Sequence, residues 1–138
     1  MPGLTTHYLF GLKVLHDISN LEIKEKVLKH RGAYALGLQG PDIFFYSART
    51  LSSRFQNLGS TMHKTYTGDF FKNYITGLDL KTGKEKDILL SYFQGFLCHY
   101  ILDCTAHPYI YYMTGFRYRN ASQANQCSAC LLYTSRCV

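Results

Sequence analysis

The chain has no tryptophan, only three prolines among its 138 residues, and no long uninterrupted apolar run. The scarcity of proline, together with 46% hydrophobic residues, excludes a disordered tail or an extended linker as the main state. A membrane-spanning helix needs about 18 consecutive apolar residues. The most apolar stretch, 88–113, is interrupted by His99, Asp103 and His107. We therefore predict a single packed domain without a transmembrane span.

Signals for targeting and for nucleic-acid binding are also weak. The first residues lack a basic region followed by an apolar run, so we see no signal peptide and expect a cytoplasmic protein. The net charge of +6 permits an anionic partner such as a phosphate ester, a nucleic acid or an acidic membrane surface. The basic residues are interspersed with acidic ones, however, and form no basic and aromatic strip. The sequence therefore gives little support for a nucleic-acid partner.

Hydrophobic periodicity indicates helices along most of the chain. It predicts helices at residues 4–18, 21–38, 41–46, 69–78 and 85–106. Asn20 caps the second helix and Pro41 begins the third. Residues 47–67 are predicted to hold a helix end, a loop and a short turn. Because no segment shows the alternation of a strand, we predict the all-α class.

Three potential metal ligands lie on the last of these helices. His99, Asp103 and His107 are spaced by four residues, so they share one helical face. Burying such groups is costly unless they are paired or bound to metal, and no lysine or arginine occurs between Lys86 and Arg117. His99 and His107 lie about 12 Å apart along the helix axis, which is too far for both to bind one zinc ion. Two or more metal ions bridged by Asp103 fit this spacing better than a single ion. A hydrogen-bonded polar core is the alternative interpretation.

The helix geometry near these residues has one further feature. Pro108 disfavours helical conformation at the residue before it. We therefore expect the helix to end or kink at His107, which would release this side chain from strict helical spacing.

Three other residues are weaker candidates when each is taken alone. Helical periodicity turns His7 toward the core and His16 away from it. Asp42 lies in the first turn of its predicted helix, where a carboxylate acts as a cap, and His63 lies in a predicted loop turn. Each position thus has an ordinary structural interpretation.

Taken together, these residues and their neighbours resemble a known family. The segments Met1-Pro-Gly-Leu-Thr-Thr-His7, Gly40-Pro-Asp42 and Met62-His63, followed by His99-x3-Asp103-x3-His107-Pro108, are similar to the zinc-dependent phospholipase C family. The similarity is greatest to bacterial members without a signal peptide and spans about residues 1–115. It implies an all-helical bundle with a trinuclear zinc cleft that hydrolyses the head-group phosphodiester of a phospholipid.

The resemblance also implies a role for each candidate residue. Asp42, His63, His99 and Asp103 would hold one zinc, and Asp103 would bridge to a second zinc shared with His7. His107 would belong to a third. Asp42 would serve as the catalytic general base as well as a ligand.

The chain departs from the family pattern in three ways. The family completes its third zinc site with a later histidine and a glutamate four residues beyond it, and no histidine here has that partner. Secreted members use an N-terminal tryptophan as a ligand, which this chain lacks. The Asp103-x3-His107 spacing is shorter than the Asp-x5-His of the best-known members.

The C-terminal segment has an unusual composition. Residues 130–138 correspond codon by codon to a transposon mosaic end used in sequencing libraries, joined to its reverse complement. We therefore expect a truncated phospholipase C-like domain at 1–129 and a non-native tail at 130–138. The zinc-knuckle spacing of Cys127 and Cys130 then carries no meaning, while Cys98 and Cys104 are predicted to be reduced core thiols.

The predicted function is that of a zinc-dependent hydrolase with two or three Zn²⁺ ions, although the truncated fragment itself is expected to be inactive. Its partner would be a phospholipid or other phosphodiester, with transient contact to a membrane surface. Aromatic residues could line a lipid-facing cleft: Phe45, Tyr46, Tyr66 and Tyr100. The alternatives are an inactive metal-binding module of the same fold and a zinc nuclease that acts on single-stranded nucleic acid.

Overall fold

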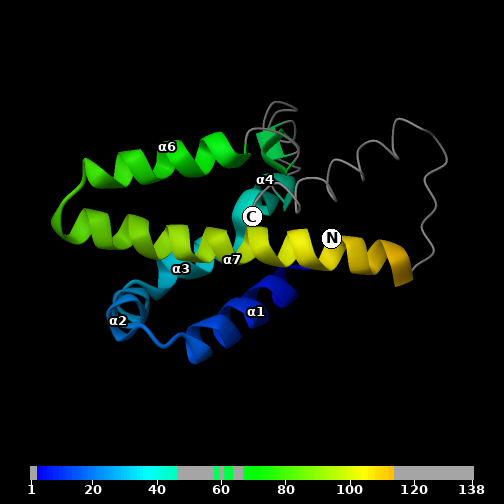
Figure 1. Cartoon of the computed structure of the whole chain (residues 1–138), viewed down its shortest axis with the longest axis horizontal. Coiled ribbons are helices and arrows are strands. Elements are labelled where there is room, and N and C mark those ends of the chain that lie inside the picture. Colours follow the sequence, from blue (N-terminus) through cyan, green and yellow to red (C-terminus); the bar gives the residue numbers. More distant parts are fainter. Residues whose placement is uncertain (1–2, 47–57, 60, 64–66, 114–138) are drawn as a thin grey trace.

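The computed structural model describes residues 3–46, 58–59, 61–63 and 67–113 of the chain (Figure 1). These residues form helices joined by short turns, and none of them lies in a β-strand. The all-α prediction is confirmed. The elements are α1 (Leu4–Asp17), α2 (Leu21–Lys29), α3 (Arg31–Gln39), the 3-10 helix η1 (Gly40–Asp42), α4 (Ile43–Tyr46), α6 (Thr67–Asp79) and α7 (Gly83–Met113).

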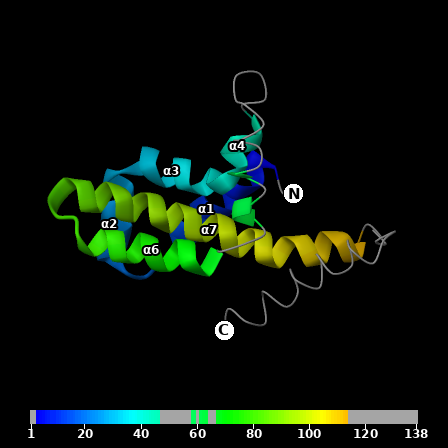
Figure 2. The ribbon, with the colours of Figure 1, turned by 90° about the horizontal axis from the view of Figure 1, so that it is seen from above.

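The longest helix, α7, is the centre of the bundle. Figures 1 and 2 show α6 running beside it on one side, with α1 and α3 on the other. The most extensive packing is between α3 and α7. Among the described helices, none has both the length and the apolar character required to cross a membrane.

The α3–α7 interface depends on two glycines that let the backbones meet. A Cβ atom on Gly37 would overlap the α7 backbone and would lie 2.8 Å from the nitrogen of Phe96. A Cβ atom on Gly95 would overlap the α3 backbone and would lie 2.9 Å from the nitrogen of Leu38. This close approach brings the end of α3 against the second half of α7, where His99 lies.

The hydrophobic core lies along the same interface. Val27, Tyr34, Leu38 and Cys98 form its buried cluster. The Tyr34 hydroxyl is not left unpaired, because it donates a 2.8 Å hydrogen bond to the carbonyl of Gly11. Cys98 is a buried free thiol, as predicted, and burial raises its pKa. Cys104, the other predicted core thiol, is only partly buried.

Two predicted helix boundaries are wrong. The helix expected at 21–38 is broken at His30, whose φ of −122° and ψ of 44° leave the helical region. The buried Ser91 hydroxyl of α7 donates a 3.1 Å hydrogen bond to the His30 carbonyl, so the break is held by a contact distant in sequence. The helix expected to end near His107 instead continues through Pro108 to Met113. Proline removes only one backbone donor, and the rest of the helical ladder remains.

Candidate metal centre

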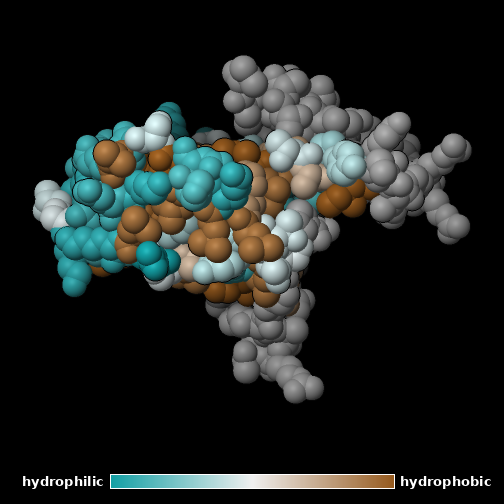
Figure 3. Space-filling model, turned by 90° about the horizontal axis from the view of Figure 1, so that it is seen from below, coloured by the Kyte–Doolittle hydropathy of each residue, from teal (hydrophilic) through white to brown (hydrophobic). Residues whose placement is uncertain are grey.

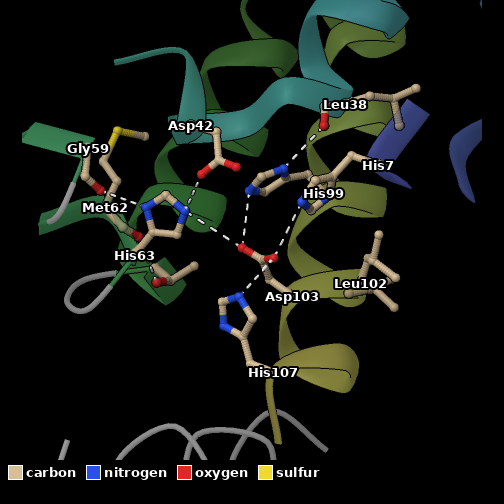
Figure 4. Close-up of polar contacts among 12 residues, drawn as sticks. His7, Leu38, Asp42, Gly59, Met62, His63, His99, Leu102, Asp103 and His107 are labelled. Atoms are coloured by element: carbon tan, nitrogen blue, oxygen red, sulfur yellow. Dashed lines mark hydrogen bonds and ion pairs between the residues drawn. The ribbon is translucent and has the colours of Figure 1, made fainter. Parts of the chain in front are cut away.

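The six residues singled out in the sequence converge on one site (Figure 4). α1 supplies His7, η1 supplies Asp42, and the segment 61–63 supplies His63. The remaining three come from successive turns of α7: His99, Asp103 and His107. The side chains of His7 and Asp42 are almost completely buried, as is His99, each with 2% or less of its surface exposed.

Asp103 lies at the centre of the cluster. Its Oδ1 is 3.4 Å from the Nε2 atoms of both His7 and His107. Its Oδ2 is 3.3 Å from Nε2 of His99 and 3.6 Å from Nε2 of His63. One carboxylate therefore contacts four imidazoles.

Backbone carbonyl groups orient two of these rings. The Nδ1 of His99 donates to the carbonyl of Leu38 at 3.1 Å, and the Nδ1 of His63 donates to the carbonyl of Gly59 at 2.7 Å. Because a carbonyl only accepts, each neutral ring keeps its lone pair on Nε2, which points into the cluster. A lone pair facing a carboxylate oxygen forms no hydrogen bond. Such contacts require a proton or a metal cation between the two atoms.

The start of η1 is shaped to fit the His99 ring. Gly40 has a φ of +51°, a conformation that favours glycine, and a Cβ atom at this position would overlap the His99 imidazole. Pro41 follows directly and presets the backbone at the beginning of the turn. This tight turn places Asp42 on the inner side, where its Oδ1 lies 3.0 Å from Nε2 of His63.

The side-chain atoms of the cluster have the spacing expected of metal ligands. Within the described residues, Nε2 of His7, His63 and His99 and both oxygens of Asp42 and Asp103 are buried without a well-formed hydrogen bond. In a tetrahedral zinc site with bonds of about 2.0–2.1 Å, neighbouring ligand atoms lie about 3.3–3.4 Å apart. Several of the observed distances match this value. The residues therefore fit zinc better than they fit a hydrogen-bonded polar core.

The imidazoles differ in how readily they take up a proton. Burial lowers the pKa of His7, and a neighbouring imidazole lowers it further. Burial also lowers the pKa of His107. For His63, burial acts in the same direction, but contacts with Asp42 and the Gly59 carbonyl outweigh it, and its pKa is raised. Near neutral pH, His7 and His107 are thus uncharged rings, the form in which imidazole binds metal.

The two carboxylates give the site a negative charge. Burial by itself would raise the pKa of Asp103, but the contact with His99 and the nearby His107 and His7 outweigh it and lower this pKa. In the part of the chain that the structure describes, no ion pair joins Asp103 or Asp42 to a lysine or arginine. Buried negative charge without a cationic side chain favours a bound metal cation.

Of the aromatic residues predicted to line a cleft, one lies beside the cluster and another packs against α6. Phe45 lies beside the cluster, with its ring centroid 5.6 Å from that of His63. Tyr100 packs against Phe71 of α6, with centroids 5.2 Å apart. The side chain of Tyr46, the whole of Tyr66 and the tail at 130–138 lie outside the described residues. His16 is exposed on α1, as predicted.

The fold and the site define an all-α protein with a buried histidine and aspartate cluster suited to more than one metal ion. Residues 6–133 match the family model described as zinc dependent phospholipase C. The match covers most of the chain, and the chain belongs to this family. Searches of curated proteins and of solved structures gave no match.

Proposed function

We propose that this protein is a zinc-dependent phosphodiester hydrolase of the phospholipase C type, which cleaves the head-group phosphodiester of a phospholipid. The observation that carries the proposal is the convergence of four imidazoles and two carboxylates on one buried site in a member of this family. His7, Asp42, His63, His99, Asp103 and His107 would hold two or three zinc ions. When bound, clustered zinc neutralises a phosphodiester and lowers the pKa of a water molecule to about 7.

Asp42 is the proposed general base. Its carboxylate is 1% exposed and its Oδ1 faces His63. The second oxygen can accept a proton from the attacking water, since no other described side chain forms a hydrogen bond with it. η1 and the Gly40 turn hold the carboxylate in position for this step.

Exposed apolar side chains on α1 support a lipid substrate. Figure 3 shows hydrophobic side chains on the face of the molecule that carries α1 and α2. On α1, Leu9 is 58% exposed, and Tyr8 and Leu12 are each 43% exposed. Exposed apolar residues together with a net charge of +6 are compatible with transient contact at an anionic membrane surface.

The test combines zinc content with a substrate panel. We expect two or three zinc ions per chain by plasma mass spectrometry, and hydrolysis of phosphatidylcholine vesicles in preference to single-stranded DNA. His99→Ala should lower both the zinc content and the rate of hydrolysis, whereas His16→Ala, a change on the exposed face of α1, should alter neither.

Each of the other outcomes would assign the chain to a different functional class. A well-folded chain without zinc would mean that the cluster is a polar core network. Zinc without hydrolysis of any phosphodiester would identify an inactive metal-binding module. Cleavage of single-stranded DNA in preference to lipid would identify a nuclease.

A further inference from the structure

His63 is held in the cluster differently from the two most buried imidazoles. It comes from the short segment 61–63, whereas His7 and His99 lie within the long helices α1 and α7. Its side chain is 17% exposed, compared with 1% for His7 and 2% for His99. Packing around this ring is therefore less complete, and its orientation depends on contacts with a few neighbours.

Two residues contact the ring nitrogens of His63 from different sides (Figure 4). Nδ1 donates a 2.7 Å hydrogen bond to the carbonyl of Gly59, and Nε2 lies 3.0 Å from Oδ1 of Asp42. The partner of one ring nitrogen determines which form of the imidazole the other nitrogen presents. The position of the Gly59 carbonyl therefore decides whether Nε2 of His63 faces the cluster as a ligand.

The ring of Phe45 packs against both residues of this hydrogen bond. Its centroid lies 5.6 Å from that of His63, with an angle of 38° between the ring planes. A Cβ atom on Gly59 would lie 3.1 Å from Cζ of Phe45 and 3.2 Å from its Cε1. Both distances are shorter than the optimum of about 3.5–4.0 Å between carbon atoms. The backbone of Gly59 thus approaches the Phe45 ring as closely as a residue without a side chain can.

Residue 59 needs to be small for this contact and not for its backbone conformation. Within the described part of the chain, the glycines with positive φ are Gly40 and Gly83. Alanine can therefore adopt the backbone conformation of Gly59. A larger residue at position 59 would displace either the Phe45 ring or the carbonyl that His63 binds. The small residue and the aromatic ring are two parts of one contact.

Phe45 also belongs to the turn that carries Asp42. α4 follows η1 directly, so Phe45 lies three residues after Asp42 on the same short stretch of helical backbone. The Phe45 side chain is half-buried. One element therefore presents a carboxylate to Nε2 of His63 and an aromatic ring to the opposite, Gly59 side. This arrangement favours a supporting role for Phe45 over the lipid-facing role predicted from the sequence.

We propose that Phe45 is a positioning residue: it packs Gly59 and the His63 imidazole together, so that Nδ1 donates to the Gly59 carbonyl and Nε2 faces Asp42. The inference rests on the proposed function and extends it to a residue that has no ligand atom. Groups that orient a metal ligand are worth about 10–100-fold in metal affinity. The effect of Phe45 on zinc passes entirely through His63.

The first measurement needs no metal. In the chelated chain, at a pH that keeps His63 neutral, nitrogen NMR shifts of the ring report which nitrogen carries the proton. We expect the proton on Nδ1 in the unchanged chain and a mixture of both forms in Phe45→Ala. Phe93→Ala is the matched control and should keep the Nδ1 form, because Phe93 is also half-buried but packs against Phe71 and Tyr74 of α6. A Phe45→Ala protein that kept the Nδ1 form would overturn the inference.

The second measurement is zinc affinity, determined by competition with a chromophoric chelator. Phe45→Ala should weaken the binding of one zinc ion by about 10–100-fold. Phe93→Ala, which removes the same number of atoms from a half-buried site, should leave the affinity unchanged. The same affinity in both variants would contradict a positioning role for Phe45.

A cycle of variants tests the contact itself and serves where Phe45→Ala does not fold. Leucine keeps an apolar side chain at position 45 but has no atoms in place of Cζ and Cε1. Gly59→Ala should therefore weaken zinc binding in the unchanged chain and weaken it less in the Phe45→Leu background. Equal losses in the two backgrounds would show that residues 45 and 59 act independently, and the inference would fail.

The two proposals fail in different ways. An unchanged chain that binds no zinc would overturn the proposed function, while the protonated nitrogen of His63 would still decide whether Phe45 orients this ring. A chain that binds zinc and hydrolyses phospholipid, with the same zinc affinity in Phe45→Ala and Phe93→Ala, would retain the function and lose only the role of Phe45.

Discussion

The two halves of α7 have opposite effects on the stability of the fold. Its first half packs against α6 through aromatic rings from both helices, as in the stacked pair of Tyr74 and Phe93 with centroids 5.1 Å apart. The Phe96 ring lies 4.8 Å from that of Phe70 and is 3% exposed. These contacts are complete within the chain, because apolar burial and ring packing need no further partner.

The second half of α7 is incomplete within the described chain. His99 and Asp103 present buried nitrogen and oxygen atoms that lack well-formed hydrogen bonds. Unsatisfied buried polar groups cost free energy until a cation binds between them. The same helix thus has an aromatic half that stabilises the fold and a polar half that reduces stability in exchange for a binding site.

The largest expected effect is that of Asp103→Asn. The amide keeps the volume but removes the shared charge, so we expect zinc to be lost and hydrolysis to fall by about 100-fold or more. Bound zinc present at about 1,000 times its Kd would stabilise the chain by about 4 kcal/mol, and the variant would lose this contribution. In chelator, the variant should lose only the smaller contribution of the imidazole contacts that lower the pKa of Asp103.

Chemical denaturation with and without chelator checks this prediction. Asp17→Asn is the matched control, because Asp17 is exposed and its ion pair with Lys13 contributes little. If Asp103→Asn destabilised the chelated protein as strongly as the zinc-loaded protein, the carboxylate would be part of a structural network and the contrast between the two halves would fail.

Phe96→Ala should act on the other half. Removing a buried ring costs about 3–5 kcal/mol, and we expect this loss to be the same in zinc and in chelator. At saturating zinc the number of bound ions should not change. Leu80→Ala, at a residue that is 81% exposed, should alter stability by less than about 0.5 kcal/mol. A loss of zinc in a still folded Phe96→Ala protein would show that the aromatic half also supports the site.

The sequence alone predicted one part of this site better than the rest. The spacing of His99, Asp103 and His107 places them on one helical face whatever the tertiary structure, and the central position of Asp103 followed directly. The meeting of this face with His7 and His63 could not be derived from periodicity, because it depends on how the helices pack. That part of the prediction came from the family resemblance.

Other features had no signal in the sequence. The carbonyl groups of Leu38 and Gly59 orient two imidazoles, but a backbone acceptor is present at every residue and marks no position. The break at His30 depends on the Ser91 hydroxyl, which is 61 residues away. The Gly40-Pro41 pair indicated a turn, although not that the missing Cβ makes room for a histidine ring.

Gly40→Ala should have an intermediate effect and test how the η1 turn supports the polar half. The positive φ and the overlap with the His99 ring should together cost about 1–3 kcal/mol and weaken zinc binding. Gly32→Ala is the control, because a Cβ atom there meets nothing within 4 Å, and alanine in α3 should be neutral or stabilising by about 0.4–1 kcal/mol. Zinc titrations and melting curves measure both. A Gly40→Ala protein that binds zinc like the unchanged chain would exclude this supporting role.

The smallest expected effect concerns a hydroxyl group in the aromatic half. The Tyr74 hydroxyl donates a 3.0 Å hydrogen bond to the carbonyl of Leu89, and burial raises the pKa of Tyr74 to about 12. Tyr74→Phe should cost about 0.5–1.5 kcal/mol at neutral pH. Because the folded pKa lies above the ordinary value of about 10, Tyr74 should favour the folded state fully below pH 10 and lose this contribution as the pH rises through 12.

Absorbance at alkaline pH, followed in the chelated chain and in Tyr74→Phe, reports this titration directly. Denaturation at neutral pH and near pH 12 then shows whether the difference between the two proteins shrinks as the hydroxyl ionises. A Tyr74 that ionised near pH 10 would mean that the α6–α7 interface admits water, and the aromatic half would then be less complete than its ring packing indicates.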